Sequence, residues 1–273
     1  IINFAAQGMV AESWKTPLHW YQTNLISQVA LHDELRKIKR IKKYLHFSTP
    51  EVYGDTRNKW IIENNYYCPT TPYAVSRAAC DLHLESFRKA YDFPVVLTRA
   101  ANVYGPGQQL YRIIPRTILS CLSSQKLYLH GLGVSERSFI YIKDVMKATI
   151  DICLKANPGS EFHISTNQAI SIKDLVKMIC DILAVEFDDI VVYTEDRLGK
   201  DQSYFLDSKK LRKSVFNTTF LIFLPLCLTR FFLPALTVNF SSFFCNTFKT
   251  TAFSSVLTVC LPLLFLAVLL VIF

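Results

Sequence analysis

The chain has 273 residues, 51% of them apolar, which is enough to build one large α/β domain or two small ones. Its eight cysteines form no C-x-x-C pair and show no metal-ligand spacing, so the composition disfavours a disulfide scaffold and favours free thiols in a reducing, cytoplasmic environment. The net charge of +8 includes one basic run, RKIKRIKK at 36–43, which we expect to form the solvated end of a helix; no aromatic residues alternate with it, so nucleic acid is not an expected partner.

Short β-rich runs alternate with helical patterns over the first half of the chain. In order, the sequence predicts a strand at IINFAA, helical material from about Pro17 to Lys43, a strand KYLHFST ending at Thr49, a helix from Pro72 to Tyr91 and a strand VVLTRAAN at 95–102. Apolar strands that alternate with helices are typical of an α/β fold with a parallel, doubly wound sheet.

The pattern is looser beyond Gly105. The sequence predicts a helix near Ile114 to Leu122, strands at KLYLHG, FIYI and EFHIS, a helix KDVMKATIDICLKA, and a helix SIKDLVKMICDILAV that Ser171 opens with Asp174 as its capping partner. We interpret 105–214 as a small substrate-binding region interleaved with the last strands of the sheet.

Residues 215–273 differ in kind from the rest. They contain no acidic residue, only two basic ones and more than half of the 20 phenylalanines. The segment from Thr250 to Phe273 is uncharged and long enough to cross a bilayer, whose core needs roughly 20 apolar residues. A C-terminal membrane anchor and a stretch translated out of its proper frame both remain open, whereas a buried core helix is disfavoured because prolines interrupt the apolar runs.

The start of the helix at 72–91 is unusually well specified. Thr71 can cap it, and Pro72 fits the first helical position, where a missing N–H costs nothing. Tyr73 then lies in the first turn, where the helix dipole favours negative charge, and Arg77 follows four residues later on the same face. A tyrosine beside a fixed cation is a candidate proton-transfer group.

Polar residues also follow three of the predicted strands, where parallel sheets bind their ligands. These segments are Ala5-Ala6-Gln7, Ser48-Thr49-Pro50-Glu51 and the stretch that begins at Asn102. Together with Tyr73 and Arg77 they predict one pocket that holds a hydroxyl, a carboxylate, a phenol and a cation.

The order and spacing of seven blocks give this pocket a family context: NFAAQGMVAESW, STPEVYGDT, TPYAVSRAACDLHLESF, TRAANVYGPGQ, IPRTIL, LHGLGVSERSFIYIKDV and RLGKDQSYFLDSKKLR. The chain resembles the extended short-chain dehydrogenases/reductases, specifically the NAD-dependent nucleotide-sugar epimerase/dehydratase family and its dTDP-glucose 4,6-dehydratase-like branch. The resemblance implies a Rossmann-type sheet, NAD as cofactor, a nucleoside-diphosphate sugar as substrate and a homodimer. It divides the chain into a partial NAD-binding domain at 1–104, the substrate region at 105–214 and a non-family tail at 215–273.

The same resemblance implies a role for each candidate residue. Tyr73 would take the proton of the sugar C4 hydroxyl, with Arg77 in place of the usual lysine, and Glu51 would remove the C5 proton. Further roles fall to Thr49 at the sugar hydroxyl, to Ala5, Ala6, Gln7 and Ser48 beside the cofactor, and to Asn102, Arg112 and Arg137 at the nucleotide phosphates. No metal is implied. The alternatives are a surface arginine for Arg77 and a solvated carboxylate for Glu51.

Two departures from the family keep other functions open. Pro50 occupies the position where dehydratases carry an acidic aspartate, so a UDP-glucuronate decarboxylase or a 4-epimerase remains an alternative. The sequence also lacks the G-x-x-G-x-x-G turn that binds the cofactor pyrophosphate, so we expect a chain that begins at about the fourth strand. An inactive, membrane-tethered nucleotide-sugar-binding module is the alternative outside enzymes.

Overall fold

The structure, a computed structural model, describes residues 1–196, 199 and 201–214. The expectations for the tail at 215–273 lie outside these residues. The chain divides into two compact units. The sheet unit comprises the described residues of Ile1–Val103, Tyr128–Asp174 and Tyr193–Ile222, and the helical unit comprises those of Tyr104–Leu127 and Leu175–Val192. The domain boundaries expected from the sequence stay a prediction.

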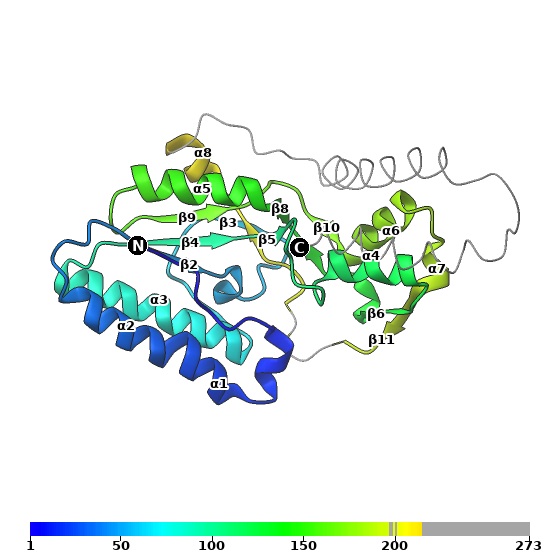
Figure 1. Cartoon of the computed structure of the whole chain (residues 1–273), viewed down its shortest axis with the longest axis horizontal. Coiled ribbons are helices and arrows are strands. Elements are labelled where there is room, and N and C mark those ends of the chain that lie inside the picture. Colours follow the sequence, from blue (N-terminus) through cyan, green and yellow to red (C-terminus); the bar gives the residue numbers. More distant parts are fainter. Residues whose placement is uncertain (197–198, 200, 215–273) are drawn as a thin grey trace, which may run out of the picture. The chain divides into compact units, whose positions relative to one another are not determined.

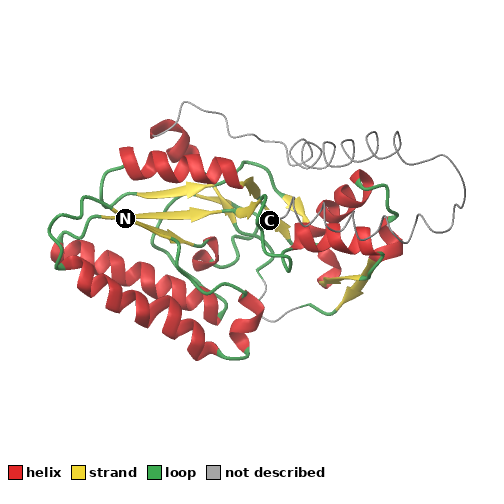
Figure 2. Ribbon diagram, in the orientation of Figure 1, coloured by secondary structure: helices red, strands yellow, loops and turns green. Residues whose placement is uncertain are grey.

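A four-stranded parallel sheet forms the centre of the sheet unit, with the strand order β1-β2-β4-β9. The strands are β1 (Ile2–Asn3), β2 (Tyr44–Ser48), β4 (Val95–Ala100) and β9 (Glu161–Ile164). Helices cover both faces, with α2 and α3 on one side and α5 on the other (Figures 1 and 2). The doubly wound, parallel α/β fold expected from the sequence is therefore confirmed.

Helix α3 (Pro72–Tyr91) has the bounds that the sequence predicts. The Thr71 hydroxyl accepts a hydrogen bond from the Ala74 N–H at 3.1 Å, and Pro72 occupies the first helical position. The buried face of α3, with Cys80 and Leu84, packs on Tyr44, Val95 and Leu97 of the sheet. This packing fixes where the first turn of α3 lies along the strands of the sheet.

The helical material at the start of the chain is shorter than expected. It consists of α1 (Pro17–Tyr21), a π-helical turn (Gln22–Ile26) and α2 (Ser27–Arg36), and it ends at Arg36 instead of Lys43. Most of the basic run at 36–43 is therefore loop, not helix. Like charges three and four residues apart would repel one another along a helix, which accounts for the early end.

On the opposite face, α5 (Ile142–Lys155) buries Val145, Ala148 and Ile152 against Leu45, Val96 and Ile164 of the sheet. The remaining short elements of the sheet unit include η1 (Val10–Trp14), η3 (Pro50–Tyr53), β3 (Trp60–Ile61), η4 (Gly131–Gly133), β7 (Glu136–Arg137), β8 (Phe139–Tyr141), β10 (Ile170–Ser171), β12 (Phe205–Leu206) and α8 (Lys209–Ser214). The core thus lies on both faces of one sheet, and short elements surround its edges.

The helical unit contains α4 (Ile113–Ser123) and α7 (Phe187–Ile190). Four described elements contain a boundary between the units: β5 (Asn102–Tyr104), β6 (Leu127–His130), α6 (Ile172–Ile182) and β11 (Val191–Thr194). The predicted capping pair is present, because Asp174 N–H donates to the Ser171 hydroxyl at 3.0 Å and that hydroxyl donates to the Asp174 carboxylate.

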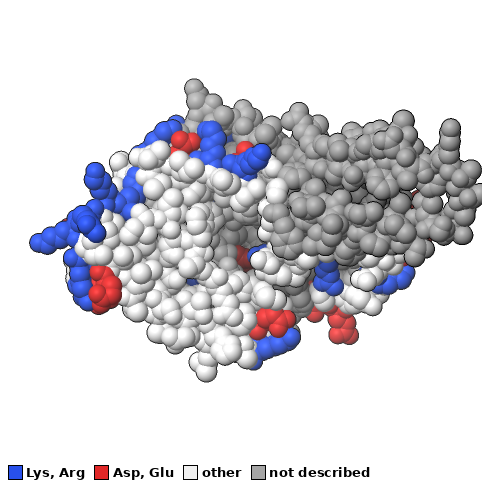
Figure 3. All heavy atoms as spheres, in the orientation of Figure 1, with Lys and Arg blue, Asp and Glu red and all other residues white. Residues whose placement is uncertain are grey.

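Among the described residues, none of the helices combines the length and the apolar character needed to span a bilayer. On the face shown in Figure 3, most of the described surface is uncharged, and the basic and acidic side chains form small groups near its margins. This face therefore presents no continuous basic surface in the part of the chain that the structure describes.

Candidate active site

Strand β2 ends in a short polar segment that turns sharply. Ser48 donates to the Asp81 carboxylate at 2.7 Å, and the Thr49 hydroxyl donates to the Glu51 carboxylate. Pro50 then begins the 3-10 turn η3. Thr49 is buried and Glu51 is half-buried. The Thr49 hydroxyl thus orients the Glu51 carboxylate. A freely solvated carboxylate, the alternative for Glu51, would have no such partner.

Arg77 lies inside the protein, with only 1% of its surface exposed, so the alternative of a surface arginine is wrong. Its Nη2 donates to the backbone carbonyl of Phe47 and to Nε2 of His46 at 3.2 Å, which places the guanidinium beside the C-terminal part of strand β2. Its Nε and Nη1 have no acceptor among the described residues. A buried donor without a partner costs about 1–3 kcal/mol, so this cation is suited to an acceptor from outside the chain.

Tyr73 lies in the first turn of α3, one turn before Arg77, and is half-buried. Its backbone N–H donates to the Ser13 hydroxyl of η1 at 3.2 Å. The turn η3 packs on the same helix, because Val52 and Ala78 share one apolar cluster. The candidate base, the candidate cation and the segment that carries Glu51 therefore belong to one packed assembly.

A buried charge network that was not predicted from the sequence connects α3 to the strands of the sheet. Arg99 of β4 pairs with Asp81 of α3 at 2.8 Å and with Glu161 of β9 at 2.9 Å, and the side chains of Arg99 and Asp81 are fully buried. Asp81 is also the residue that holds Ser48. A charged residue inside the apolar run VVLTRAAN was the available signal, since a buried arginine requires an acidic partner.

The segment after β1 is held by side chains from the helical layer. Gln28 donates to the Ala5 carbonyl at 3.2 Å, and the Asn24 amide bonds both the N–H and the carbonyl of Gln7, at 2.7 and 3.0 Å. Ala5 and Ala6 are exposed. Asn24 is fully buried within the π-helical turn, so these bonds hold the segment after β1 in place.

Asn102 and Arg137 both contact Tyr204, which belongs to the last of the seven sequence blocks. The Tyr204 hydroxyl donates to Asn102 Oδ1 at 3.3 Å, and the Arg137 guanidinium stacks on the Tyr204 ring at 4.2 Å. Arg137 also donates to the carbonyls of Asp201 and Gln202, at 2.7 and 2.8 Å, so much of its donor capacity is used within the protein. The Asn102 amide nitrogen is buried and has no acceptor among the described residues.

Arg112 belongs to the helical unit. It is exposed, precedes α4 as its N-cap residue, and its guanidinium lies over the Tyr111 ring at 5.5 Å. Ser48 thus ends β2, Thr49 and Glu51 follow it, Tyr73 and Arg77 lie in the first two turns of α3, and Arg112 belongs to the other unit.

Comparison with known proteins identifies the family of the chain. Residues 1–215 match the family described as GDP-mannose 4,6 dehydratase. The dTDP-D-glucose 4,6-dehydratase of Bos taurus is 33% identical over 216 residues, which cover 77% of this chain and 61% of the relative. A trifunctional UDP-glucose 4,6-dehydratase/UDP-4-keto-6-deoxy-D-glucose 3,5-epimerase/UDP-4-keto-L-rhamnose-reductase of Arabidopsis thaliana is 32% identical over 216 residues, 78% of this chain and 32% of the relative. The chain thus spans less than two thirds of these relatives.

Solved structures show the same fold. The dTDP-glucose 4,6-dehydratase of Streptomyces venezuelae, with NAD and TYD bound, superposes with a TM-score of 0.80 at 26% identity, covering 84% of this chain and 70% of that one. The UDP-glucose 4-epimerase of Thermotoga maritima, with UDP-glucose, gives a TM-score of 0.77 at 26% identity, covering 86% and 77%.

Proposed function

The chain belongs to the GDP-mannose 4,6-dehydratase family of the extended short-chain dehydrogenases/reductases, and from this premise we propose that it acts as an NAD-dependent nucleoside-diphosphate-sugar 4,6-dehydratase. The reaction oxidises the sugar at C4 and eliminates water across C5 and C6. The observation that carries the proposal is the combination at one strand end of a half-buried tyrosine, a buried arginine with two unpartnered donors and a carboxylate oriented by a threonine.

The residues present fit the nicotinamide end of the cofactor. Arg77 offers buried N–H groups that have no acceptor among the described residues, and a ribose supplies hydroxyl acceptors. Ser48 and the segment Ala5-Ala6-Gln7 are proposed as the neighbouring walls. When bound, NAD accepts a hydride from the sugar and returns it. We assign residues to this end alone, because the sequence holds no glycine-rich turn for the pyrophosphate.

Tyr73 is proposed as the base that takes the proton from the C4 hydroxyl. A free phenol has a pKa of about 10, so a phenol that acts near neutral pH needs an environment that favours its ionised form. Arg77, one turn further along α3, supplies a permanent positive charge, and the N-terminus of α3 adds a favourable dipole.

Glu51 is proposed to act next. Once C4 is a ketone, the proton on C5 becomes acidic, and a carboxylate can remove it while the hydroxyl on C6 takes a proton from solvent water and leaves as water. The hydrogen bond from Thr49 fixes one carboxylate oxygen of Glu51 and so limits the directions in which this base can reach. Asn102, Arg112 and Arg137 are proposed for the nucleotide and its phosphates, which suit amide and guanidinium donors.

Pro50 favours a second candidate function. The position beside Glu51 carries no acidic side chain that could protonate the leaving hydroxyl. A nucleotide-sugar 4-epimerase or UDP-glucuronate decarboxylase has no need of that acid, because neither reaction expels the C6 hydroxyl. A homodimer is proposed by membership of the family. Membrane contact through the tail concerns residues that the structure does not describe.

The replacement Glu51→Gln tests the proposal and separates the two candidates. We expect the purified protein with NAD to convert dTDP-glucose or UDP-glucose into a 4-keto-6-deoxy sugar, and we expect Glu51→Gln to lower that rate by about 100-fold or more while C4 oxidation persists. Reduced cofactor and product are followed by absorbance and NMR. Glu34→Gln, on the exposed side of α2, is the matched control. A C4 epimer or a pentose product, formed equally well by Glu51→Gln, would overturn the dehydratase assignment.

A further inference from the structure

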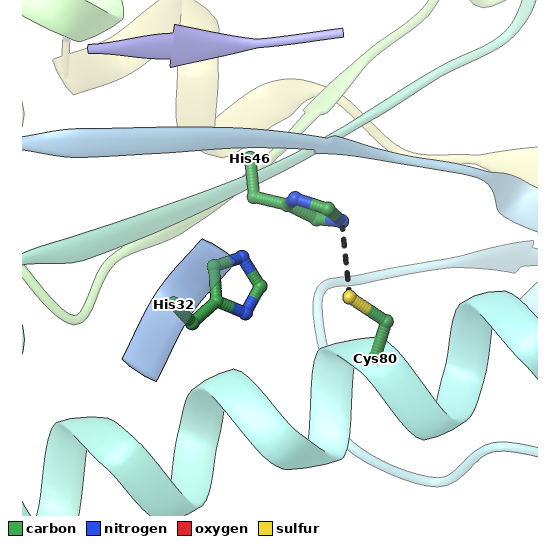
Figure 4. A group of neighbouring side chains, drawn as sticks. All are labelled: His32, His46 and Cys80. Atoms are coloured by element: carbon green, nitrogen blue, oxygen red, sulfur yellow. Dashed lines mark hydrogen bonds between the residues drawn. The ribbon is translucent and has the colours of Figure 1, made fainter. Parts of the chain in front are cut away.

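Three side chains with metal-binding donors meet beneath the candidate active site. His32 comes from α2, His46 from β2 and Cys80 from α3, and all three are fully buried (Figure 4). One donor atom of each lies within 4.8 Å of the others. This is the single group of its kind among the described residues.

The geometry approaches that of a three-coordinate metal site. Nε2 of His46 is 3.8 Å from Sγ of Cys80, and the rings of His32 and His46 lie nearly edge to face, 6.1 Å apart at 81°. Nitrogen and sulfur ligands around a planar three-coordinate metal, at bond lengths of about 2.0 and 2.3 Å, lie roughly 3.5–3.7 Å from each other. A contraction of about 1 Å or less would close the triangle.

An unpartnered nitrogen of His32 provides a second, independent observation. Nδ1 of His32 and Nδ1 of His46 are buried and have no hydrogen-bond partner among the described residues. His32 uses its other nitrogen to contact the Tyr44 hydroxyl at 2.9 Å, a contact that would hold the ring for coordination. The orphaned Nδ1 of His32 is costly in this fully buried cluster unless a ligand satisfies it, whereas the nitrogen of His46 that lies near Cys80 is Nε2, not the orphaned Nδ1.

The protonation states suit a metal that binds thiolate strongly. Burial, reinforced by His83, lowers the pKa of His32 to about 3, so its imidazole is neutral. Burial, together with Asp81, raises the pKa of the Cys80 thiol to about 12, so binding must expel a proton. A soft cation that forms strong bonds to thiolate is the kind that displaces this proton.

The charges nearby decide between cations. Arg77 donates to His46 and Arg99 pairs with Asp81 and Glu161, so these two cations and two carboxylates balance. A Cys80 thiolate with a monovalent ion keeps the balance, whereas a divalent ion leaves one uncompensated positive charge in a buried place. Burial of net charge is costly. The electrostatics therefore favour Cu(I) over Zn(II).

A third histidine, His83, lies against the group. It is half-buried and stacks on His32, with the ring centroids 5.4 Å apart and the planes at 15°. Its Nε2 has no partner among the described residues.

We propose that His32, His46 and Cys80 form a binding site for one Cu(I) ion, distinct from the candidate active site. Binding forms two Cu–N bonds and one Cu–S bond and releases the thiol proton of Cys80, with no change of oxidation state. Because Nε2 of His46 also accepts from Arg77, an ion that takes this nitrogen displaces one hydrogen bond of that arginine.

The test is an anaerobic titration of the purified protein with Cu(I) in competition with a chromogenic chelator. The background carries Cys121→Ser and Cys180→Ser, because these two thiols lie 3.9 Å apart and form another candidate for soft metals. We expect one Cu(I) that is lost from both His32→Leu and Cys80→Ala, with affinity lowered by more than about 100-fold. Cys153→Ser, at a half-buried thiol, is the matched control and should leave that ion in place.

X-ray absorption of the loaded background protein should show two nitrogen ligands and one sulfur ligand. Equal Cu(I) affinity in Cys80→Ala, a copper shell without nitrogen, or no bound ion would overturn the proposal, and tighter binding of Zn(II) than of Cu(I) would overturn the charge argument. Circular dichroism and melting of each variant identify any loss of fold, and Cys80→Ala, the smallest change, decides the case where His32→Leu does not fold.

Discussion

Arg77 connects the candidate active site to the proposed metal site. One of its nitrogens holds the end of β2 and His46, and two others remain buried without acceptors among the described residues. A lysine would present a single ammonium here, whereas the planar guanidinium can bind β2 and a ligand simultaneously. An arginine in place of the usual lysine is thus compatible with a cofactor contact. The two unpartnered nitrogens of Arg77 would then take the part of the lysine ammonium.

Tyr73 gives the sharpest prediction at the scale of the residue. Tyr73→Phe removes the proposed base and keeps the ring, so we expect kcat to fall by about 100-fold to 10,000-fold while binding of the nucleotide sugar changes little. Steady-state kinetics and calorimetric titration measure the two quantities. Tyr66→Phe, at a phenol that is 88% exposed, is the matched control. Equal losses of kcat and binding in Tyr73→Phe would indicate a structural role instead.

At the level of secondary-structure elements, a buried ion pair joins helix α3 to the sheet. Asp81 accepts from Arg99 at 2.8 Å and from Ser48 at 2.7 Å, with no exposed surface on either member of the ion pair. Removal of the Asp81 charge leaves the buried Arg99 with Glu161 as its remaining carboxylate partner among the described residues and leaves Ser48 without its charged acceptor. The pair therefore holds the helix in register with the segment that carries Thr49 and Glu51.

We expect Asp81→Asn to lower the free energy of unfolding by about 3–5 kcal/mol, the range for breaking a buried ion pair, as measured by urea denaturation. Asp33→Asn, which breaks exposed pairs with Arg36 and Lys37, should change it little. Similar small losses for both variants would show that Asp81 contributes no more than a surface carboxylate.

Local signals explain which elements the sequence predicts well. The cap at Thr71 and the proline after it define the start of α3, and the pair Ser171 and Asp174 defines that of α6. No comparable stop signal follows α2, so the sequence placed its end at Lys43, seven residues beyond Arg36 where the structure ends it. Helix ends set by charge repulsion and by the return into a strand are not visible in a hydrophobic pattern.

The metal-binding group shows the limit of prediction from spacing. His32, His46 and Cys80 come from two helices and a strand, and no fixed spacing relates them. Their proximity arises only when α2 and α3 pack on the same face of the sheet, against β2 (Figure 1). The same holds for Arg99 and Asp81, whereas the Tyr73 and Arg77 pair lies on one helix and could be recognised from the sequence.

At the scale of the whole molecule, buried neutral histidines make stability depend on pH. Burial, reinforced by Arg99, lowers the pKa of His163 to about 3, compared with about 6.5 for a free imidazole. The folded protein therefore holds His163 neutral while the unfolded chain protonates it below about pH 6.5. Its contribution to stability is complete above that pH and is lost progressively as the pH falls towards 3.

We accordingly expect the free energy of unfolding, measured with urea and a metal chelator present, to decrease between pH 7 and pH 5 by about 2 kcal/mol from His163 alone. His163→Gln should flatten this dependence, and His19→Gln, at an exposed position on α1, should leave the slope unchanged. An unaltered slope in His163→Gln would show that this ring does not titrate as its burial requires.

We propose above that this chain oxidises C4 of a nucleotide sugar, with hydride transfer from C4 to NAD and with Tyr73 and Arg77 beside the C4 hydroxyl. The most direct measurement follows deuterium placed at C4 of dTDP-glucose or UDP-glucose, by NMR and mass spectrometry of the product formed with NAD. The account predicts that deuterium leaves C4 and appears at C6 of a product that has lost one water, and that Tyr73→Phe nearly abolishes this transfer. Deuterium that stays at C4 of unchanged sugar would contradict it.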